Sequence, residues 1–77
     1  MNKQQRGEYN ALVSQQTTYK KLVEEANEYL NELIEVHVNH PTIASEINKS
    51  MAENILDGYR SDLFFINSKL EAFLKDL

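Results

Sequence analysis

The stretch of sequence from Tyr9 to His37 reads YNALVSQQTTYKKLVEEANEYLNELIEVH. Its apolar residues recur at i, i+3, i+4 and i+7, which is the spacing of one face of an amphipathic helix. A helix of about 30 residues is about 45 Å long, which is longer than so small a globule is wide. The apolar stripe must therefore be covered by an element of equal length, either the rest of this chain or a second copy. The stripe consists of Tyr9, Leu12, Val13, Tyr19, Leu22, Val23, Ala26, Leu30, Leu33 and Ile34.

Signals at both ends place this first helix at about residues 2–38. Asn2 is a favourable N-cap, and Gln5 follows at the spacing of a capping box. The segment from Asn39 to Thr42 contains the only proline, Pro41, and the residue before a proline is disfavoured in the helical region. The sequence therefore predicts a turn at residues 39–42, with Pro41 in the first turn of the next helix.

The second helical segment, about residues 42–76, carries two groups of apolar residues on different faces. At about 100° per residue, the second group is offset from the first by about a quarter of a turn. Asp57 and Gly58 lie between the groups, and Ser61 is a favourable N-cap, so a break at residues 57–60 is an alternative to one long helix. The first group is Ile43, Ala44, Ile47, Met51 and Ile55, and the second is Ala52, Leu56, Tyr59, Leu63, Ile66, Leu70, Phe73, Leu74 and Leu77.

These patterns predict an all-α fold in one helical domain, residues 1–77. We expect a long antiparallel helical hairpin that dimerises into a four-helix bundle, with a three-helix bundle broken at Gly58 as the alternative. A chain of this length buries a small fraction of its surface, and natural examples add disulfides, a metal or oligomerisation. Because the chain has no cysteine, oligomerisation is the expected source of stability.

Phe64 and Phe65 stand in a run of four apolar residues, which spans too wide an arc for one helix seam to bury. Exposed aromatic pairs are typical of interfaces, although the wide core of a three-helix bundle would also cover them. We predict an interface made of Phe64, Phe65, Tyr59, Ile43, Ile47 and Met51.

The charges favour a protein partner over nucleic acid. The net charge of −4 argues against binding to phosphates, which require a basic face. An acidic surface is predicted opposite the apolar stripe of the first helix. It is either a solvated face that maintains solubility or a surface that docks on a basic patch. Its residues are Glu25, Glu28, Glu32 and Glu35.

One set of carboxylates suggests an enzyme as an alternative. The spacing of Glu24, Glu25 and Glu28, followed by Glu53 and Asp57, resembles the metal-binding pattern of the all-α nucleotide pyrophosphohydrolases of the MazG type. The resemblance implies Mg²⁺ bound by carboxylate oxygens and engaging nucleotide phosphates. The last two carboxylates are four residues apart, whereas that family uses a spacing of three.

The sequence contains few candidate residues for zinc binding or for catalysis. His37 and His40 supply two of the three or four ligands that zinc requires, and His37 is better suited to the end of the seam, at the negative end of the helix dipole. The sequence offers no Ser-His-Asp grouping, phosphate-binding glycine loop or cysteine nucleophile. We therefore expect no catalytic, cofactor-binding or metal-binding residue.

The predicted function is a non-enzymatic protein-protein interaction module, a small regulator, adaptor or inhibitor of a larger cytoplasmic protein. The excess of Lys over Arg and the frequent Asn favour a Gram-positive bacterium of low G+C content or its phage, and hence a phage-encoded inhibitor of a host or defence enzyme. The absence of cysteine and of a long apolar run favours the cytoplasm, without a membrane partner. The alternatives are the Mg²⁺-dependent hydrolase and a structural helical subunit of a larger assembly.

Overall fold

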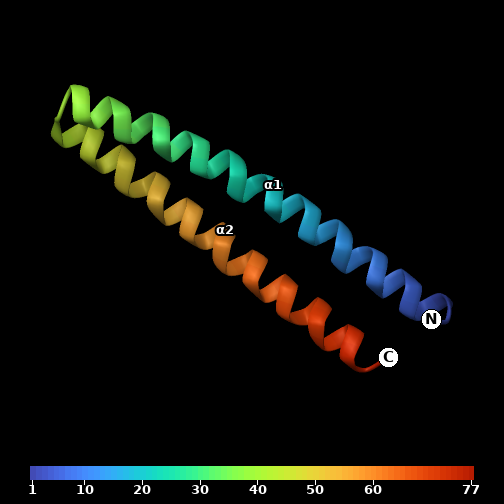
Figure 1. Ribbon diagram of the computed structural model, residues 1–77. Coiled ribbons are helices and arrows are strands. Elements are labelled where there is room, and N and C mark those ends of the chain that lie inside the picture. The colour runs from blue at the N-terminus through green and yellow to red at the C-terminus, as the bar shows by residue number, and fades with distance from the viewer.

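The computed structural model describes residues 1–77 and contains two long helices. Helix α1 spans Lys3–Asn39 and helix α2 spans Ile43–Lys75. The two helices run antiparallel from a tight corner, so that both termini lie at the opposite end of the molecule (Figure 1). The molecule is 57 Å long but only 15 Å and 13 Å across. The predicted all-α helical hairpin is confirmed.

Side-chain caps determine where each helix begins. The Gln5 N–H donates to Asn2 Oδ1 at 2.8 Å and the Asn2 N–H donates to Gln5 Oε1 at 3.0 Å, which completes the capping box. Thr42 and Ser45 form a second capping box, so α2 begins at Ile43. Pro41 therefore precedes the N-cap and lies outside the helix. The expectation that Pro41 occupies the first turn of α2 was wrong, because the Thr42 hydroxyl satisfies the amide at the third helical position.

Helix α2 continues without interruption through Gly58. Gly58 has no positive φ, and a Cβ added there would meet nothing within 4 Å. The alternative three-helix arrangement with a break at residues 57–60 does not form. One glycine costs a helix about 1 kcal/mol, which the hydrogen bonds and packing of a 33-residue helix tolerate.

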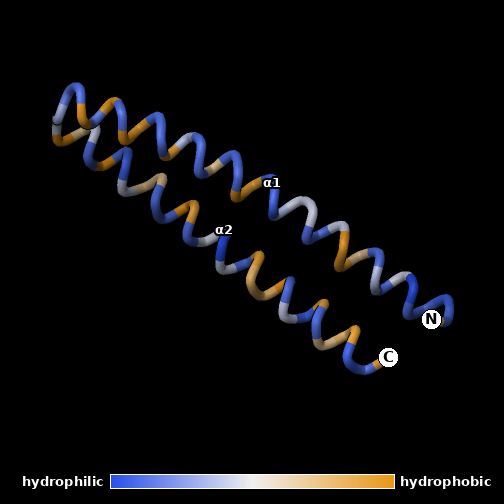
Figure 2. Tube along the Cα trace, viewed as in Figure 1, coloured by the Kyte–Doolittle hydropathy of each residue, from blue (hydrophilic) through white to orange (hydrophobic).

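The seam between the helices holds a small core that is concentrated near the corner. Apolar and hydrophilic segments alternate along both helices (Figure 2). Leu30, Ala52 and Leu56 are buried together, and Val23, Ala26 and Leu33 pack against them. Further from the corner, Gln16 Nε2 donates to Asn67 Oδ1 at 2.8 Å. A polar pair of this kind across a seam specifies the register of the two helices.

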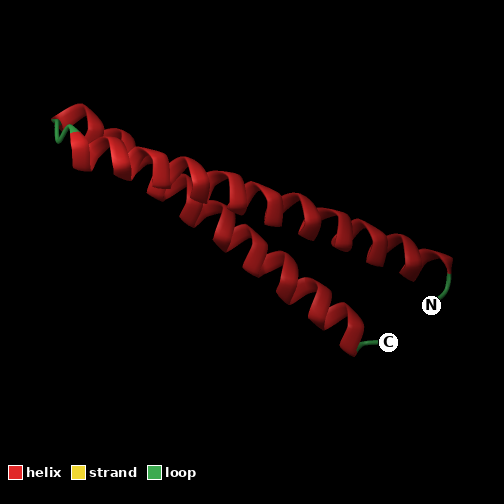
Figure 3. Cartoon of the chain, turned by 45° about the horizontal axis from the view of Figure 1, so that its top comes forward, coloured by secondary structure: helices red, strands yellow, loops and turns green.

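The helices draw apart from the corner toward the termini (Figures 1 and 3). Small residues such as Ala26 and Ala52 occupy the seam in the half that contains the corner. In the other half, aromatic rings meet across the seam: Tyr19 and Tyr59 have centroids 6.3 Å apart, and Tyr9 and Phe73 are 6.4 Å apart. These aromatic contacts connect the two helices in the half of the hairpin that contains the termini.

Candidate functional site

The first half of α2 presents a row of exposed apolar side chains. Ile43, Ile47, Met51 and Ile55 recur every four residues, and each is at least half exposed, from 50% for Ile55 to 82% for Ile43. The second apolar group of α2, which includes Leu56 and Ile66, takes the positions that face α1. The quarter-turn offset in the sequence therefore separates a face that packs inside the hairpin from a face that no residue of this chain covers.

A surface depression between the helices identifies which residues of α1 lie on the same side of the hairpin as Met51 of α2. Gln15 of α1 and Phe65 of α2 both line this depression, so they lie on the same side of the molecule. Residues at heptad spacing share a helix face, so Tyr29 and Val36 lie on the side of Gln15, and Met51 on the side of Phe65. The depression has a volume of about 310 Å³ and is lined by Gln15, Tyr19, Asp62, Phe65, Ile66 and Lys69.

These exposed residues form a single apolar surface near the corner, here called the outer apolar face. On α2, Ile47, Met51 and Ile55 fall within an arc of about 80°, since each step of four residues turns the helix direction by about 40°. Tyr29 and Val36 are 54% and 50% exposed on the adjoining side of α1. The outer apolar face comprises Tyr29, Val36, Ile47, Met51 and Ile55.

Phe64 and Phe65 are both exposed, at 73% and 60%, but they lie on different flanks of α2. Consecutive helical residues are about 100° apart, so Phe64 points away from the side that carries Phe65 and the outer apolar face. The Lys69 ammonium nitrogen lies 4.6 Å from the centroid of the Phe65 ring, a cation-π arrangement. The two phenylalanines are thus available to two different surfaces.

Tyr59 lies inside the hairpin. It is half-buried and its ring meets Tyr19 edge-on at 75°. This pairing uses part of the aromatic surface of Tyr59 in the seam, so Tyr59 offers less surface to a partner than the other predicted interface residues do. The remaining five residues of the predicted interface are exposed: Phe64, Phe65, Ile43, Ile47 and Met51.

The acidic surface lies on α1. All four glutamates are exposed, and Lys21 Nζ approaches Glu25 Oε1 at 4.0 Å. An exposed ion pair of this kind contributes little to stability. Glu28, Glu32 and Glu35 form no ion pair within the chain, so their charge is directed to solvent.

The carboxylates that resemble the MazG-type pattern do not converge. Glu24, Glu25 and Glu28 are exposed on α1, and Glu53 and Asp57 are exposed on α2. No group of three or more His, Asp or Glu residues has an arrangement that could hold a metal ion. A shared Mg²⁺ would need oxygen ligands from both helices around one point, and these positions do not supply them.

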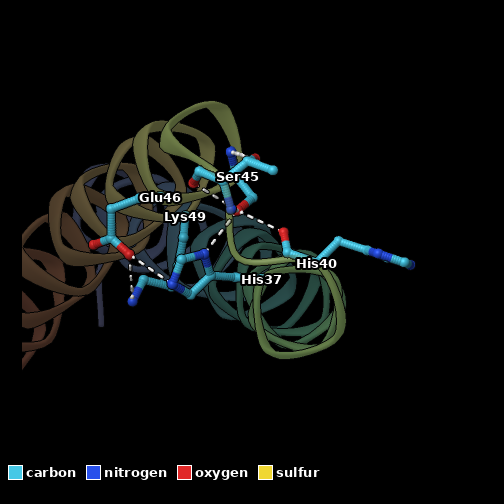
Figure 4. A network of polar contacts seen from close by, with 6 residues as sticks. His37, His40, Ser45, Glu46 and Lys49 are labelled. Carbon is cyan, nitrogen blue, oxygen red and sulfur yellow. Dashed lines mark hydrogen bonds and ion pairs between the residues drawn. The ribbon is translucent and has the colours of Figure 1, made fainter.

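A polar cluster at the corner contains a Ser-His-Glu chain that is not evident from the sequence (Figure 4). Ser45 Oγ lies 2.7 Å from His37 Nδ1, and His37 Nε2 lies 3.0 Å from Glu46 Oε2. Glu46 Oε2 is also 3.3 Å from Lys49 Nζ. The His40 side chain points away from the cluster, so the two histidines do not face a common ligand.

The geometry of this cluster is that of a helix cap. Ser45 is buried, and its hydroxyl oxygen accepts the Thr42 N–H at 3.0 Å. The same oxygen lies 2.9 Å and 3.2 Å from the carbonyl oxygens of Thr42 and His40. A hydroxyl has one proton to donate, so these contacts saturate it. The surface depression lies along the helices away from the corner, and no cavity for a substrate adjoins Ser45.

Neither helix has an apolar stretch of sufficient length to cross a lipid bilayer. Comparison of the chain with protein-family models, with curated proteins and with solved structures gives no match.

Proposed function

We propose that this chain is a non-enzymatic interaction module that binds a larger protein, with Phe64 as the anchor of the contact. The observation that carries the proposal is the 73% exposure of Phe64 in the interior of a continuous helix. Burying a large apolar side chain contributes about 1.5–3 kcal/mol, and a few such anchors supply most of the affinity of an interface.

The surroundings of Phe64 support this role. The residues one turn before and after it are Arg60, Ser61, Asn67 and Ser68, and all four are exposed. An apolar anchor within a polar rim is the usual arrangement at the centre of a protein interface.

The charge of the chain favours a basic surface on the partner. The net charge is −4, and Glu28, Glu32 and Glu35 have no partner within the chain. Complementary charges accelerate association and select the orientation of the encounter. A regulator, adaptor or inhibitor that acts by occupying such a surface requires no chemistry of its own.

Affinity capture with matched variants tests the proposal. The tagged wild-type chain, Phe64→Ser and Val38→Ser are each incubated with lysate of a low-G+C Gram-positive bacterium, and retained proteins are quantified by mass spectrometry. Val38 is 72% exposed beside the corner and serves as the control for loss of an apolar side chain. We expect one larger protein to be retained in stoichiometric amount by wild type and Val38→Ser, and lost from Phe64→Ser.

Two outcomes would contradict the proposal. The first is equal retention of the partner by Phe64→Ser, when circular dichroism shows unchanged helix content. The second is Mg²⁺-dependent release of pyrophosphate from nucleoside triphosphates that disappears in Glu28→Gln, which would establish the hydrolase instead.

A further inference from the structure

We infer that the outer apolar face binds a second copy of this chain, forming an antiparallel four-helix bundle with Met51 at the two-fold axis. This inference goes beyond the proposed function, because it concerns the flank of α2 opposite to Phe64. The proposed dimer also leaves Phe64 exposed, so that Phe64 can bind a different protein while the dimer is intact.

One chain exposes enough surface to bury the area that a dimer interface requires. The chain has an accessible surface of 5793 Å² and a mass of 8.9 kDa. A compact folded monomer of that mass exposes about 4,800 Å². The excess of about 1,000 Å² is close to the ~800 Å² that each partner buries in an interface of standard size. Only five residues are buried within the hairpin, and none of the large side chains is fully covered.

The composition of the face is that of an interface core. The side of α2 that presents Ile47, Met51 and Ile55 carries no charged residue between Ile43 and Gly58. Asp62 is the first charge on this side, about 16 Å along the helix from Met51. Depletion of charge at the centre, with charged residues at the edge, distinguishes the core of an interface from the rest of a protein surface.

The spacing of the apolar residues favours the antiparallel arrangement. Ile47 and Ile55 lie four residues before and after Met51. A two-fold axis through Met51 therefore places Ile47 of one copy against Ile55 of the second copy, as an isologous contact requires.

The charges favour the same arrangement. Two antiparallel copies hold their Asp62 residues about 33 Å apart, since each is 11 residues from the axis at 1.5 Å per residue. Two parallel copies would instead bring each Asp62 beside its own counterpart, where like charges repel.

Single-cysteine cross-linking tests both the face and the orientation. Because the chain has no cysteine, Met51→Cys and Ile43→Cys each introduce one thiol without background. In the proposed dimer, the two copies of residue 51 are adjacent. The two copies of residue 43 are about 24 Å apart, far beyond the ~7 Å between Cα atoms that a disulfide spans. We expect a dimeric mass for the wild-type chain, cross-linking of Met51→Cys under mild oxidation, and none of Ile43→Cys.

Charge reversal provides the matched control. Met51→Glu places two like charges at the axis and is expected to give a monomer. Asn31→Glu adds the same charge at an exposed position of α1 and is expected to remain dimeric. Asn31 points away from the outer apolar face, because two residues turn a helix by about 200° and Tyr29 lies on that face.

The inference would be overturned if the wild-type chain sediments as a monomer at about 100 µM while circular dichroism shows that its helices are intact. Cross-linking of both cysteine variants would overturn the antiparallel orientation. The two proposals fail separately, because Phe64→Ser tests partner binding in a chain that should still dimerise.

Discussion

Ser45 shows how much structure one hydroxyl group can organise. It closes the capping box of α2, and it connects the corner to α1 through His37. One of its contacts crosses between the helices, since His37 belongs to α1 and Ser45 to α2, and the others lie within the corner. A single atom thereby positions the start of α2 relative to the end of α1.

Replacement of this hydroxyl should destabilise the hairpin. In Ser45→Ala, the Thr42 N–H and His37 Nδ1 each lose a partner in a part-buried environment. We expect a loss of about 1–3 kcal/mol in the free energy of unfolding, measured by urea denaturation followed by circular dichroism. Ser68→Ala is the control, because the Ser68 hydroxyl bonds only to the carbonyl of Phe64 in its own helix. A loss in Ser68→Ala as large as that in Ser45→Ala would show that the corner contacts contribute nothing specific.

At the scale of the element, α2 performs two tasks with one continuous helix. Its buried positions pack on α1 along the whole hairpin, while its first half presents a second apolar row to the outside. A helix with one apolar stripe requires one packing partner to cover that stripe. A helix with two apolar stripes on different faces requires two partners. The continuity of α2 through Gly58 keeps both stripes in fixed angular relation.

Gly58→Ala should stabilise α2. Gly58 has ordinary helical backbone, and an added Cβ meets no atom of the hairpin. The substitution removes backbone freedom from the unfolded chain, so we expect a gain of about 0.5–1 kcal/mol in the free energy of unfolding. Urea denaturation of the variant beside wild type measures it. A loss of stability would indicate that another molecule approaches the α2 backbone at this position.

The whole molecule is a rod with little interior. Its length is nearly four times its larger width, and its one cluster of buried residues, Leu30, Ala52 and Leu56, lies in the half nearest the corner. In a molecule of two helices, no side chain can contact more than one other helix, so the hairpin buries little surface for its length. The proposed dimer adds a second layer of helices to the half of the rod where the outer apolar face lies.

Thermal stability should accordingly depend on protein concentration. If folding and dimerisation are coupled, mass action raises the stability of the folded state as concentration rises. We expect the wild-type Tm to increase over a hundredfold range of concentration, and the Tm of Met51→Glu to be lower and constant. Thermal melts followed by circular dichroism at several concentrations measure both. A wild-type Tm that does not change with concentration would contradict the coupling.

Several features of the fold could be predicted from the sequence because their causes are local. Asn2 and Gln5 are three residues apart and form their cap within one turn. The apolar repeat from Tyr9 to His37 predicts α1, and the turn signals around Pro41 predict the corner. The exact start of α2 could not be predicted from the sequence, because Thr42 and Pro41 are both acceptable near a helix start and only the side-chain contacts of Thr42 distinguish them.

By itself, the sequence determined two helices, the corner between them and the existence of two apolar groups on α2. These follow from periodicity and capping, which act over a few residues. Only the tertiary structure decided that α2 is unbroken, that Tyr59 belongs to the seam, and that His37, Ser45 and Glu46 meet. The physical reason is that each of these depends on the packing of one helix against the other. The register and spacing of that packing are properties of the pair and are absent from either helix alone.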